Sequence, residues 1–218
     1  MTARATAGWS AEYLAALRTG NRHRALAVLD DARAAGLDVR AVYLDVLQPA
    51  MRAIGQLWQE NELTVAEEHL ATAVTHVAMG RLYAECCTGA EPIGRTLLAA
   101  CVDGERHELG LRMVCDLLEL EGWDARYLGA TVPADSLVAM VMRERPDALA
   151  LSASTAPRLA ELRAMIAAVR AACGDASPFI LAGGRPFHDD EVLARRLGAD
   201  ATAPDAAAAV AMLKERFG

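Results

Sequence analysis

The sequence has no excess of basic residues and no long apolar run. Its 22 Lys and Arg residues are outnumbered by 29 Asp and Glu residues, and the formal net charge is −7. Because domains that bind a phosphate backbone usually carry a clustered basic face, we expect no direct contact with nucleic acid. No run reaches the roughly 18 apolar residues of a membrane-spanning helix, and residues 1–10 lack the apolar centre of a signal peptide. We therefore expect a globular, cytoplasmic protein that does not contact a membrane.

Cysteines in metal-binding pairs are also missing. The chain has five cysteines, an odd number, and the adjacent Cys86 and Cys87 cannot form the two-residue-spaced pair of a zinc site. We expect reduced, mostly buried thiols. With 218 residues, of which 54% are hydrophobic, the chain is long enough for one large domain or two small ones, each with its own core.

The first part of the chain follows a helical period and has no run of alternating β-branched residues. Ser10 is placed to cap a first helix, and Pro49 is expected to bend a third. Thr64, with Glu67 three residues later, has the spacing of a capping box at the start of a fourth. The four predicted helices cover about 10–18, 21–36, 40–60 and 64–87. They predict an all-α four-helix bundle as a first domain, residues 1–90.

The second part alternates short apolar runs with helical stretches, which is typical of a parallel α/β sheet. The predicted helices start near Glu108, Pro133, Pro157, Asp189 and Asp205. The predicted strands are 96–102, 124–129, 148–152, 179–182 and 200–202. The pattern predicts a second domain, residues 93–218, with a Rossmann-like, flavodoxin-like five-stranded parallel sheet.

Several polar residues and glycines follow the predicted strands, at the sheet edge where such folds bind ligands. His107 follows the first strand, Ser152 and Ser154 end the third, and Gly183–Gly184 ends the fourth. Glu105 precedes His107 by two residues and can hold one ring nitrogen while the other ligates a metal. Taken singly, the histidine could be an ordinary turn residue and the glycine pair ordinary turn chemistry. Their convergence at one edge favours a binding site.

The pattern Glu105-x-His107-x-x-Gly110, followed by Ser152 and Gly183–Gly184, resembles the signature of cobalamin-binding domains. The resemblance implies that His107 displaces the benzimidazole of cobalamin and becomes the lower axial ligand of cobalt. It further implies that Glu105 accepts the second N–H of His107 and that Ser152 hydrogen-bonds the base of the displaced nucleotide tail. Gly110 and Gly183–Gly184 would leave room for that tail. His188 could approach the tail phosphate or a propionamide, but its position favours an exposed turn histidine.

The helical part carries a second resemblance. Trp58, followed ten residues later by Glu68-His69, is similar to the bundle that covers cobalamin in light-sensing regulators of the MerR class. This implies that Trp58 covers the upper face of the corrin and that Glu68 contacts an adenosyl group. A tryptophan suits the task because it is large, flat and apolar. Two departures stand out: the chain begins almost directly at the bundle, without their DNA-binding domain, and Gln59 replaces a histidine found in some relatives.

These observations leave three functions open. The first is a non-catalytic sensor that binds adenosylcobalamin, whose upper ligand is lost in light; the second is a corrinoid methyl carrier that binds methylcobalamin and serves a methyltransferase. The third is a bare module that acts through a partner, with a biliverdin-type linear tetrapyrrole beside the cobalamin. A ridge of His69, Ala73, His76 and Gly80 could line that second site, or could serve helix packing. We expect a protein partner, either a regulator, a signalling protein or a methyltransferase, and self-association is compatible with the bundle.

Overall fold

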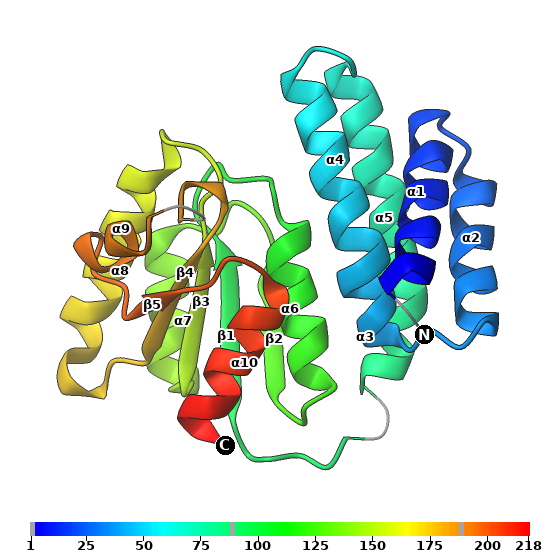
Figure 1. Cartoon of the computed structure of the whole chain (residues 1–218). Coiled ribbons are helices and arrows are strands. Elements are labelled where there is room, and N and C mark those ends of the chain that lie inside the picture. Colours follow the sequence, from blue (N-terminus) through cyan, green and yellow to red (C-terminus); the bar gives the residue numbers. More distant parts are fainter. Residues whose placement is uncertain (1–2, 88–89, 188–189) are drawn as a thin grey trace. The chain divides into compact units, whose positions relative to one another are not determined.

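The computed structural model describes residues 3–87, 90–187 and 190–218, which fall into two compact units, 1–88 and 89–218 (Figure 1). His188 and Asp189, which the sequence analysis singled out as a tail contact and a helix start, lie outside the described residues. None of the described helices is long and apolar enough to cross a membrane.

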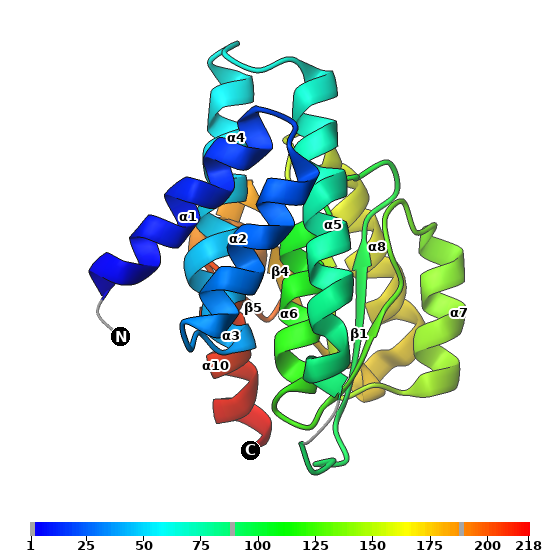
Figure 2. The same ribbon diagram turned by 90° about the vertical axis from the view of Figure 1, so that its right-hand side faces the viewer.

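The first unit is entirely helical in its described part, as predicted. Its main helices lie side by side in both Figure 1 and Figure 2 and enclose a core that includes Tyr13, Val46, Ile54 and Met79. Its elements are α1 (Ala3–Arg18), α2 (Arg22–Ala34), α3 (Val39–Ala41), the π-helical η1 (Val42–Leu47), α4 (Gln48–Gln59) and α5 (Val65–Cys87).

The start of α1 corrects one prediction. Ser10 does not cap this helix, because α1 begins at Ala3 and Ser10 lies in its middle. Residues 3–7 include three alanines and an arginine, which have high helix propensity and extend the helix toward its N-terminus. The hydroxyl of Ser10 instead donates a hydrogen bond to the carbonyl oxygen of Val46, at 3.3 Å.

The interruption that we expected at Pro49 is present, but it takes the form of a wider turn. Pro49 lies in the first turn of α4, directly after the π-helical segment, where the N–H of Gln48 bonds the carbonyl of Tyr43. A proline has no N–H to donate and its ring crowds the preceding turn, so a local π-helical turn accommodates it. At the start of α5 the predicted capping box is confirmed: Glu67 Oε2 accepts from the N–H of Thr64 at 2.7 Å, and the N–H of Glu67 donates to Thr64 Oγ1 at 3.2 Å.

The second unit contains the predicted five-stranded parallel sheet, with strand order β2-β1-β3-β4-β5 (Figure 1). This is the flavodoxin-like order, in which the direction of winding reverses between β1 and β3. The strands are β1 (Thr96–Cys101), β2 (Asp124–Tyr127), β3 (Ala148–Ser152), β4 (Phe179–Gly183) and β5 (Ala201–Thr202). The helices are α6 (Leu109–Glu119), α7 (Ala134–Glu144), α8 (Arg158–Cys173), α9 (Glu191–Arg196) and α10 (Ala206–Phe217), with short 3-10 turns η2 (Gly174–Ala176) and η3 (Arg185–Phe187).

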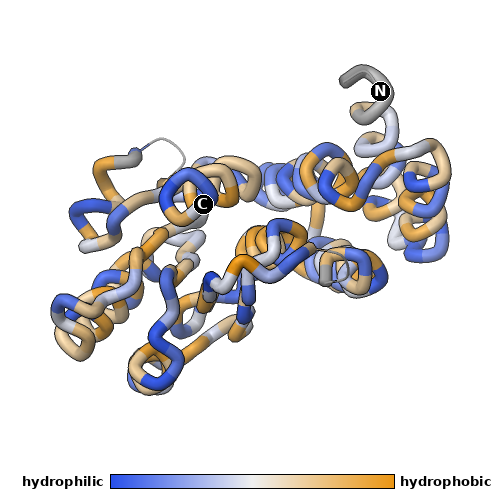
Figure 3. The backbone as a smooth tube through the Cα atoms, turned by 90° about the horizontal axis from the view of Figure 1, so that it is seen from below, coloured by the Kyte–Doolittle hydropathy of each residue, from blue (hydrophilic) through white to orange (hydrophobic). Residues whose placement is uncertain are grey.

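Helices cover both faces of the sheet, which explains why its central strands are almost uniformly apolar. On one face, Leu98, Leu149 and Ile180 pack in a single core with Val141 of α7 and Ile166 of α8. On the other face, α6 packs against β1 and against α10. In Figure 3 the helices alternate between hydrophobic and hydrophilic along their turns, as expected for helices with one buried side.

One buried hydroxyl in this sheet has no partner among the described residues. Thr202 is 9% exposed, and its Oγ1 makes no hydrogen bond. Burying an unpaired hydroxyl costs free energy, so Thr202→Val should leave the free energy of unfolding unchanged or raise it by about 1 kcal/mol. Urea unfolding of the full chain measures this.

The matched control for that prediction is Thr75→Val in the helical unit. The Thr75 hydroxyl is also buried, but it bonds the Tyr13 hydroxyl at 3.1 Å and the carbonyl of Ala71 at 2.9 Å. This variant should lose about 1–3 kcal/mol, because it leaves a buried partner unsatisfied. A loss of the same size in Thr202→Val would contradict the prediction.

Candidate functional site

The loops after β1 and β3 meet at the carboxyl edge of the sheet, at the point where the strand order reverses. Glu105, in the loop after β1, connects them: its Oε2 accepts a hydrogen bond of 2.6 Å from the backbone N–H of Ser154, in the loop after β3. Ser154 therefore contributes its backbone to the site. Such a position between two diverging loops is where open α/β sheets bind their ligands.

The other carboxylate oxygen of Glu105 holds His107. Glu105 Oε1 lies 2.5 Å from Nδ1 of the His107 ring and accepts from the backbone N–H groups of Arg106 and His107, both at 2.8 Å. The side chain of Glu105 is 2% exposed, whereas that of His107 is 54% exposed. The carboxylate is therefore buried beneath the loop while the imidazole extends from it. With Nδ1 held by Glu105, Nε2 is the nitrogen suited to bind a metal.

Glu105 remains charged in this position. Burial by itself raises the pKa of a carboxyl group, but the hydrogen bonds from the His107 ring and from the backbone of His107 and Ser154 outweigh it and lower the pKa from 4.5 to about 2. Because the pKa is lowered in the folded state, this carboxylate contributes stability above about pH 4.5, and that contribution is lost as the pH falls toward 2. Glu105 is thus a permanent hydrogen-bond acceptor for His107 near neutral pH.

The glycines that the sequence pattern singled out fall into two kinds. A Cβ atom at Gly110 or at Gly183 would meet no other atom within 4 Å, so both positions border open space. Gly184 is different: its φ is +119°, and a Cβ there would lie 2.2 Å from the carbonyl oxygen of Ala153. The close contact at Gly184 is therefore between two backbone segments of the protein, the loops after β3 and β4.

Ser152 is the last residue of β3 and shares a sheet face with two other residues of the site. It lies in register between Cys101 and Gly183, so the side chain of Ser152 points to the same face as these two positions. The residue is 6% exposed. Among the described residues its hydroxyl has no hydrogen-bond partner. The hydroxyl is not among the fully buried unpaired polar atoms, so a ligand that enters from this face can reach it and form a hydrogen bond.

Two side chains that the sequence analysis missed support the backbone around His107. The Tyr127 hydroxyl, at the end of β2, donates a hydrogen bond to the carboxylate of Glu108. The Cys101 thiol lies 3.9 Å from the carbonyl oxygen of His107 and donates to it. Burial, reinforced by the charges of Glu105 and Glu108, raises the pKa of Cys101 to about 12, so it stays a protonated donor. The only sequence signal for Tyr127 was its place near the end of a predicted strand.

Arg158 was also missed. It is the first residue of α8, and its guanidinium covers Gly104, where a Cβ atom would lie 2.5 Å from Nη1. The same nitrogen donates to the carbonyl oxygen of Asp103 at 3.5 Å. Arg158 therefore joins the turn that precedes Glu105 to the helix that follows β3.

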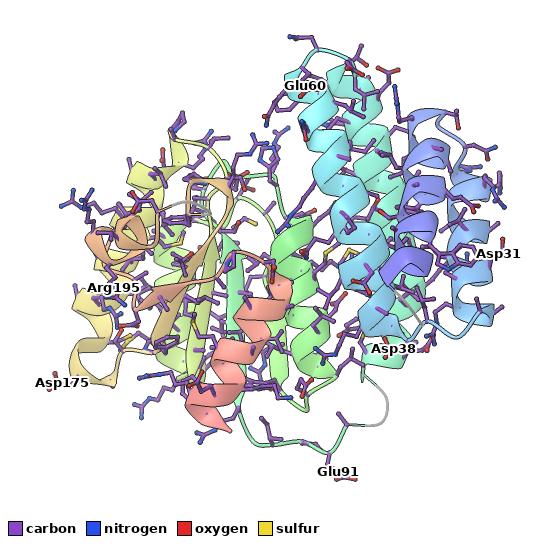
Figure 4. All side chains as sticks on the ribbon, in the orientation of Figure 1. Asp31, Asp38, Glu60, Glu91, Asp175 and Arg195 are labelled. Atoms are coloured by element: carbon purple, nitrogen blue, oxygen red, sulfur yellow. The ribbon has the colours of Figure 1, made fainter. Side chains whose placement is uncertain are left out.

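The predicted residues of the helical unit lie at one end of it. Trp58 is close to the end of α4 and Glu68 is in the first turn of α5, and a short connection that includes Glu60 joins the two helices (Figure 4). Trp58 is 38% exposed. The Glu68 carboxylate lies 2.5 Å from Nδ1 of His69 and accepts from the Thr72 hydroxyl at 2.8 Å.

The ridge on α5 is largely at the surface. His69, Ala73 and Gly80 are exposed and His76 is partly buried. A Cβ atom at Gly80 would meet nothing within 4 Å, so close helix packing does not explain this glycine.

The donor set indicates what kind of metal could bind at His107. Among the residues that the structure describes, no three His, Cys, Asp or Glu side chains come together to hold a metal ion. Cys86, Cys101 and Cys115 are buried free thiols and Cys173 is partly buried, in agreement with the prediction for these four. A metal at His107 must therefore bring most of its ligands with it, as a metal inside a planar macrocycle does.

Comparison with known proteins also indicates a metal that is bound inside a macrocycle. Residues 9–83 and 95–212 match the sequence models of two families, each described as a B12 binding domain. The HTH-type transcriptional repressors CarA and CarH of Myxococcus xanthus are each 34% identical to the chain, over 72% and 70% of it and 51% and 50% of their own lengths. The chain thus spans about half the length of these curated relatives. Dimethylamine corrinoid protein 3 of Methanosarcina acetivorans is 24% identical over 78% of both proteins.

Solved structures show the same fold. The monomethylamine corrinoid protein of Methanosarcina barkeri superimposes with a TM-score of 0.81 at 20% identity, covering 94% of this chain and 96% of that one. A cobalamin-binding protein of Desulfitobacterium hafniense gives a TM-score of 0.54 at 21% identity, covering 100% of both chains.

Proposed function

The chain belongs to the family of B12-binding domains, and on this premise we propose that it is a non-catalytic sensor that binds adenosylcobalamin and responds to light. One observation carries the binding part: an exposed imidazole, His107, whose Nδ1 is held by the buried carboxylate of Glu105. The sensing part rests on Trp58 and Glu68 at one end of the helical unit, as in the sequence pattern of the light-sensing regulators.

On the lower side of the cofactor, His107 would bind cobalt through Nε2 in place of the benzimidazole. Glu105 fixes the ring and keeps Nδ1 protonated. The displaced nucleotide tail would enter on the sheet face of Ser152, whose hydroxyl can bond the base. The open positions at Gly110 and Gly183 leave room for it.

Two more residues of the predicted site set the conformation of the loops after β3 and β4. Ser154 donates its N–H to Glu105, and so keeps the carboxylate in place. Gly184 allows the backbone after β4 to pass close to Ala153. We propose that both define the entrance of the tail without a side-chain contact to it.

On the upper side, the helical unit would cover the corrin. The indole of Trp58 offers a flat apolar surface, and Glu68 can accept hydrogen bonds from the ribose hydroxyls of an adenosyl group in addition to those from His69 and Thr72. Adenosylcobalamin supplies a light-labile cobalt–carbon bond. Loss of the adenosyl group in light would remove its contacts with Trp58 and Glu68, and this change in the helical unit would be the signal to a partner regulator or signalling protein.

A corrinoid methyl carrier is the second candidate function. The share of each chain that is matched favours this function. The dimethylamine and monomethylamine corrinoid proteins match the chain over most of both lengths, whereas the repressors match it over about half of their own length. In that case methylcobalamin would be the bound form and a methyltransferase the partner. A large indole and an adenosyl-binding carboxylate favour the sensor over the carrier, because a carrier must open its upper face to enzymes.

Adenosylcobalamin and green light test the sensor directly. The full chain, loaded in darkness, should change its absorption spectrum and its oligomeric state on illumination. Trp58→Ala should keep the dark spectrum of a histidine-ligated corrinoid but lose the light-induced change in assembly, while Trp9→Ala on α1, a matched loss of an indole, should behave like the parent.

Unchanged spectra and assembly after illumination would refute the sensor. Tight methylcobalamin binding with methyl transfer to a partner enzyme would establish the carrier instead. A red absorption band after addition of biliverdin would extend the proposal to a linear tetrapyrrole along the α5 ridge.

A further inference from the structure

The backbone at His107 has supports that are separate from the contact of its ring with Glu105. Cys101, the buried last residue of β1, donates to the carbonyl oxygen of His107. Tyr127, the last residue of β2, donates its hydroxyl to Glu108, the next residue along the chain from His107. Two neighbouring strand ends therefore converge on the peptide that carries the metal-binding imidazole.

The side chain of Glu108 does not cap the helix that it precedes. It is the N-cap residue of α6, yet its side chain makes no capping hydrogen bond. The side chains that usually accept from the first turn at this position are Ser, Thr, Asp and Asn, and glutamate is not one of them. Here the carboxylate bonds Tyr127 instead, so the start of α6 is attached to β2. The sheet sets the position of Tyr127, because β2 pairs with β1 from Asp124 to Tyr127.

The loop between β1 and α6 needs such an attachment. It is irregular from Asp103 to His107 and contains Gly104 at a φ of +72°. Glu105 holds the imidazole and the backbone N–H groups of Arg106 and His107, whereas the contacts of Cys101 and Tyr127 hold the His107 carbonyl and Glu108. Functional groups must be held within about 0.5 Å of their working geometry, which a loop without further supports does not ensure.

We propose that Tyr127 is a positioning residue for His107: through its hydroxyl it holds Glu108 and the peptide of His107, so that the imidazole is preset to bind cobalt. The proposal deepens the proposed function and rests on its lower-ligand assignment.

The experiment uses methylcobinamide, a corrinoid that lacks the nucleotide tail and so brings no base of its own. With the full chain, the absorption spectrum at saturation then reports the fraction of cobalt bound by His107, and a titration gives the Kd. Tyr127→Phe keeps the ring and removes only the hydroxyl. It should raise the fraction without histidine ligation and raise Kd by about tenfold, the low end of the effect of supporting contacts around a metal ligand.

Tyr83→Phe is the matched control, since it makes the same change at a partly exposed tyrosine of the other unit. It should leave spectrum and Kd unchanged. If Tyr127 had only a structural role, Tyr127→Phe would lower the unfolding midpoint without changing the ligated fraction, and that result would overturn the proposal.

A double-mutant cycle tests the route through Glu108. Glu108→Ala should weaken ligation as Tyr127→Phe does, and the double variant should be no worse than the stronger single one, because both remove the same contact. If the losses of the two single variants were additive in the double variant, Tyr127 would not act through Glu108. If the unaltered chain bound methylcobinamide without histidine ligation, the lower-ligand assignment itself would fail, which separates that outcome from a failure of the Tyr127 proposal.

Discussion

Replacement of His107 by alanine should remove histidine ligation altogether. Loss of a group that merely supports a metal ligand costs about 10–100-fold in affinity, so loss of the ligand itself should raise the Kd for methylcobinamide at least about 100-fold. Any cobalamin that still binds should give the spectrum of a corrinoid with its own base bound or with no lower ligand. The reason is the geometry: the His107 imidazole is 54% exposed at the edge of the sheet, and its Nδ1 is held by the buried carboxylate of Glu105.

The matched control for this prediction is His23→Ala, which removes an exposed histidine from α2 and should change neither spectrum nor affinity. Free imidazole added to the His107→Ala variant should restore the histidine-like spectrum, because Glu105 and the loop still frame the vacated position. An unaltered spectrum in His107→Ala would show that cobalt is ligated elsewhere.

Of the substitutions proposed here for their effect on stability, Gly184→Ala should lower the free energy of unfolding the most. A φ of +119° is unfavourable for alanine, a cost of about 1–3 kcal/mol, and the new Cβ would lie 2.2 Å from the Ala153 carbonyl oxygen. Since that oxygen belongs to the backbone, the loops after β3 and β4 would have to move apart. We expect a loss of about 3 kcal/mol or more in the free energy of unfolding, measured by urea denaturation.

The neighbouring glycine provides a sharp comparison. Gly183→Ala places its Cβ in open space, so it should change the free energy of unfolding by less than about 1 kcal/mol. If the nucleotide tail occupies that space, Gly183→Ala should weaken binding of cobalamin but not of methylcobinamide, which has no tail. Parent-like stability in Gly184→Ala, or equal effects on both corrinoids in Gly183→Ala, would contradict these assignments.

Much of the fold follows from local patterns. The apolar run 96–102 predicted a buried parallel strand, and β1 covers Thr96–Cys101. The Thr64 and Glu67 pair predicted the start of α5, and their reciprocal hydrogen bonds are present. Such signals are readable because they depend on residues a few positions apart. The start of α1 was misplaced because Ser10, a good cap by type, is used for a contact with Val46 in a distant helix.

The sequence by itself determined that His107, Ser152 and Gly183–Gly184 meet at one edge, because parallel strands joined by helices all end on the same side of their sheet. Only the tertiary structure decided which residues of these loops contact one another. The bond from Ser154 to Glu105 spans 49 residues and that from Tyr127 to Glu108 spans 19. The close approach of Gly184 to Ala153 joins the ends of the paired strands β3 and β4. These contacts depend on strand order and pairing register, which are set by the packing of the whole sheet and not by any local run of residues.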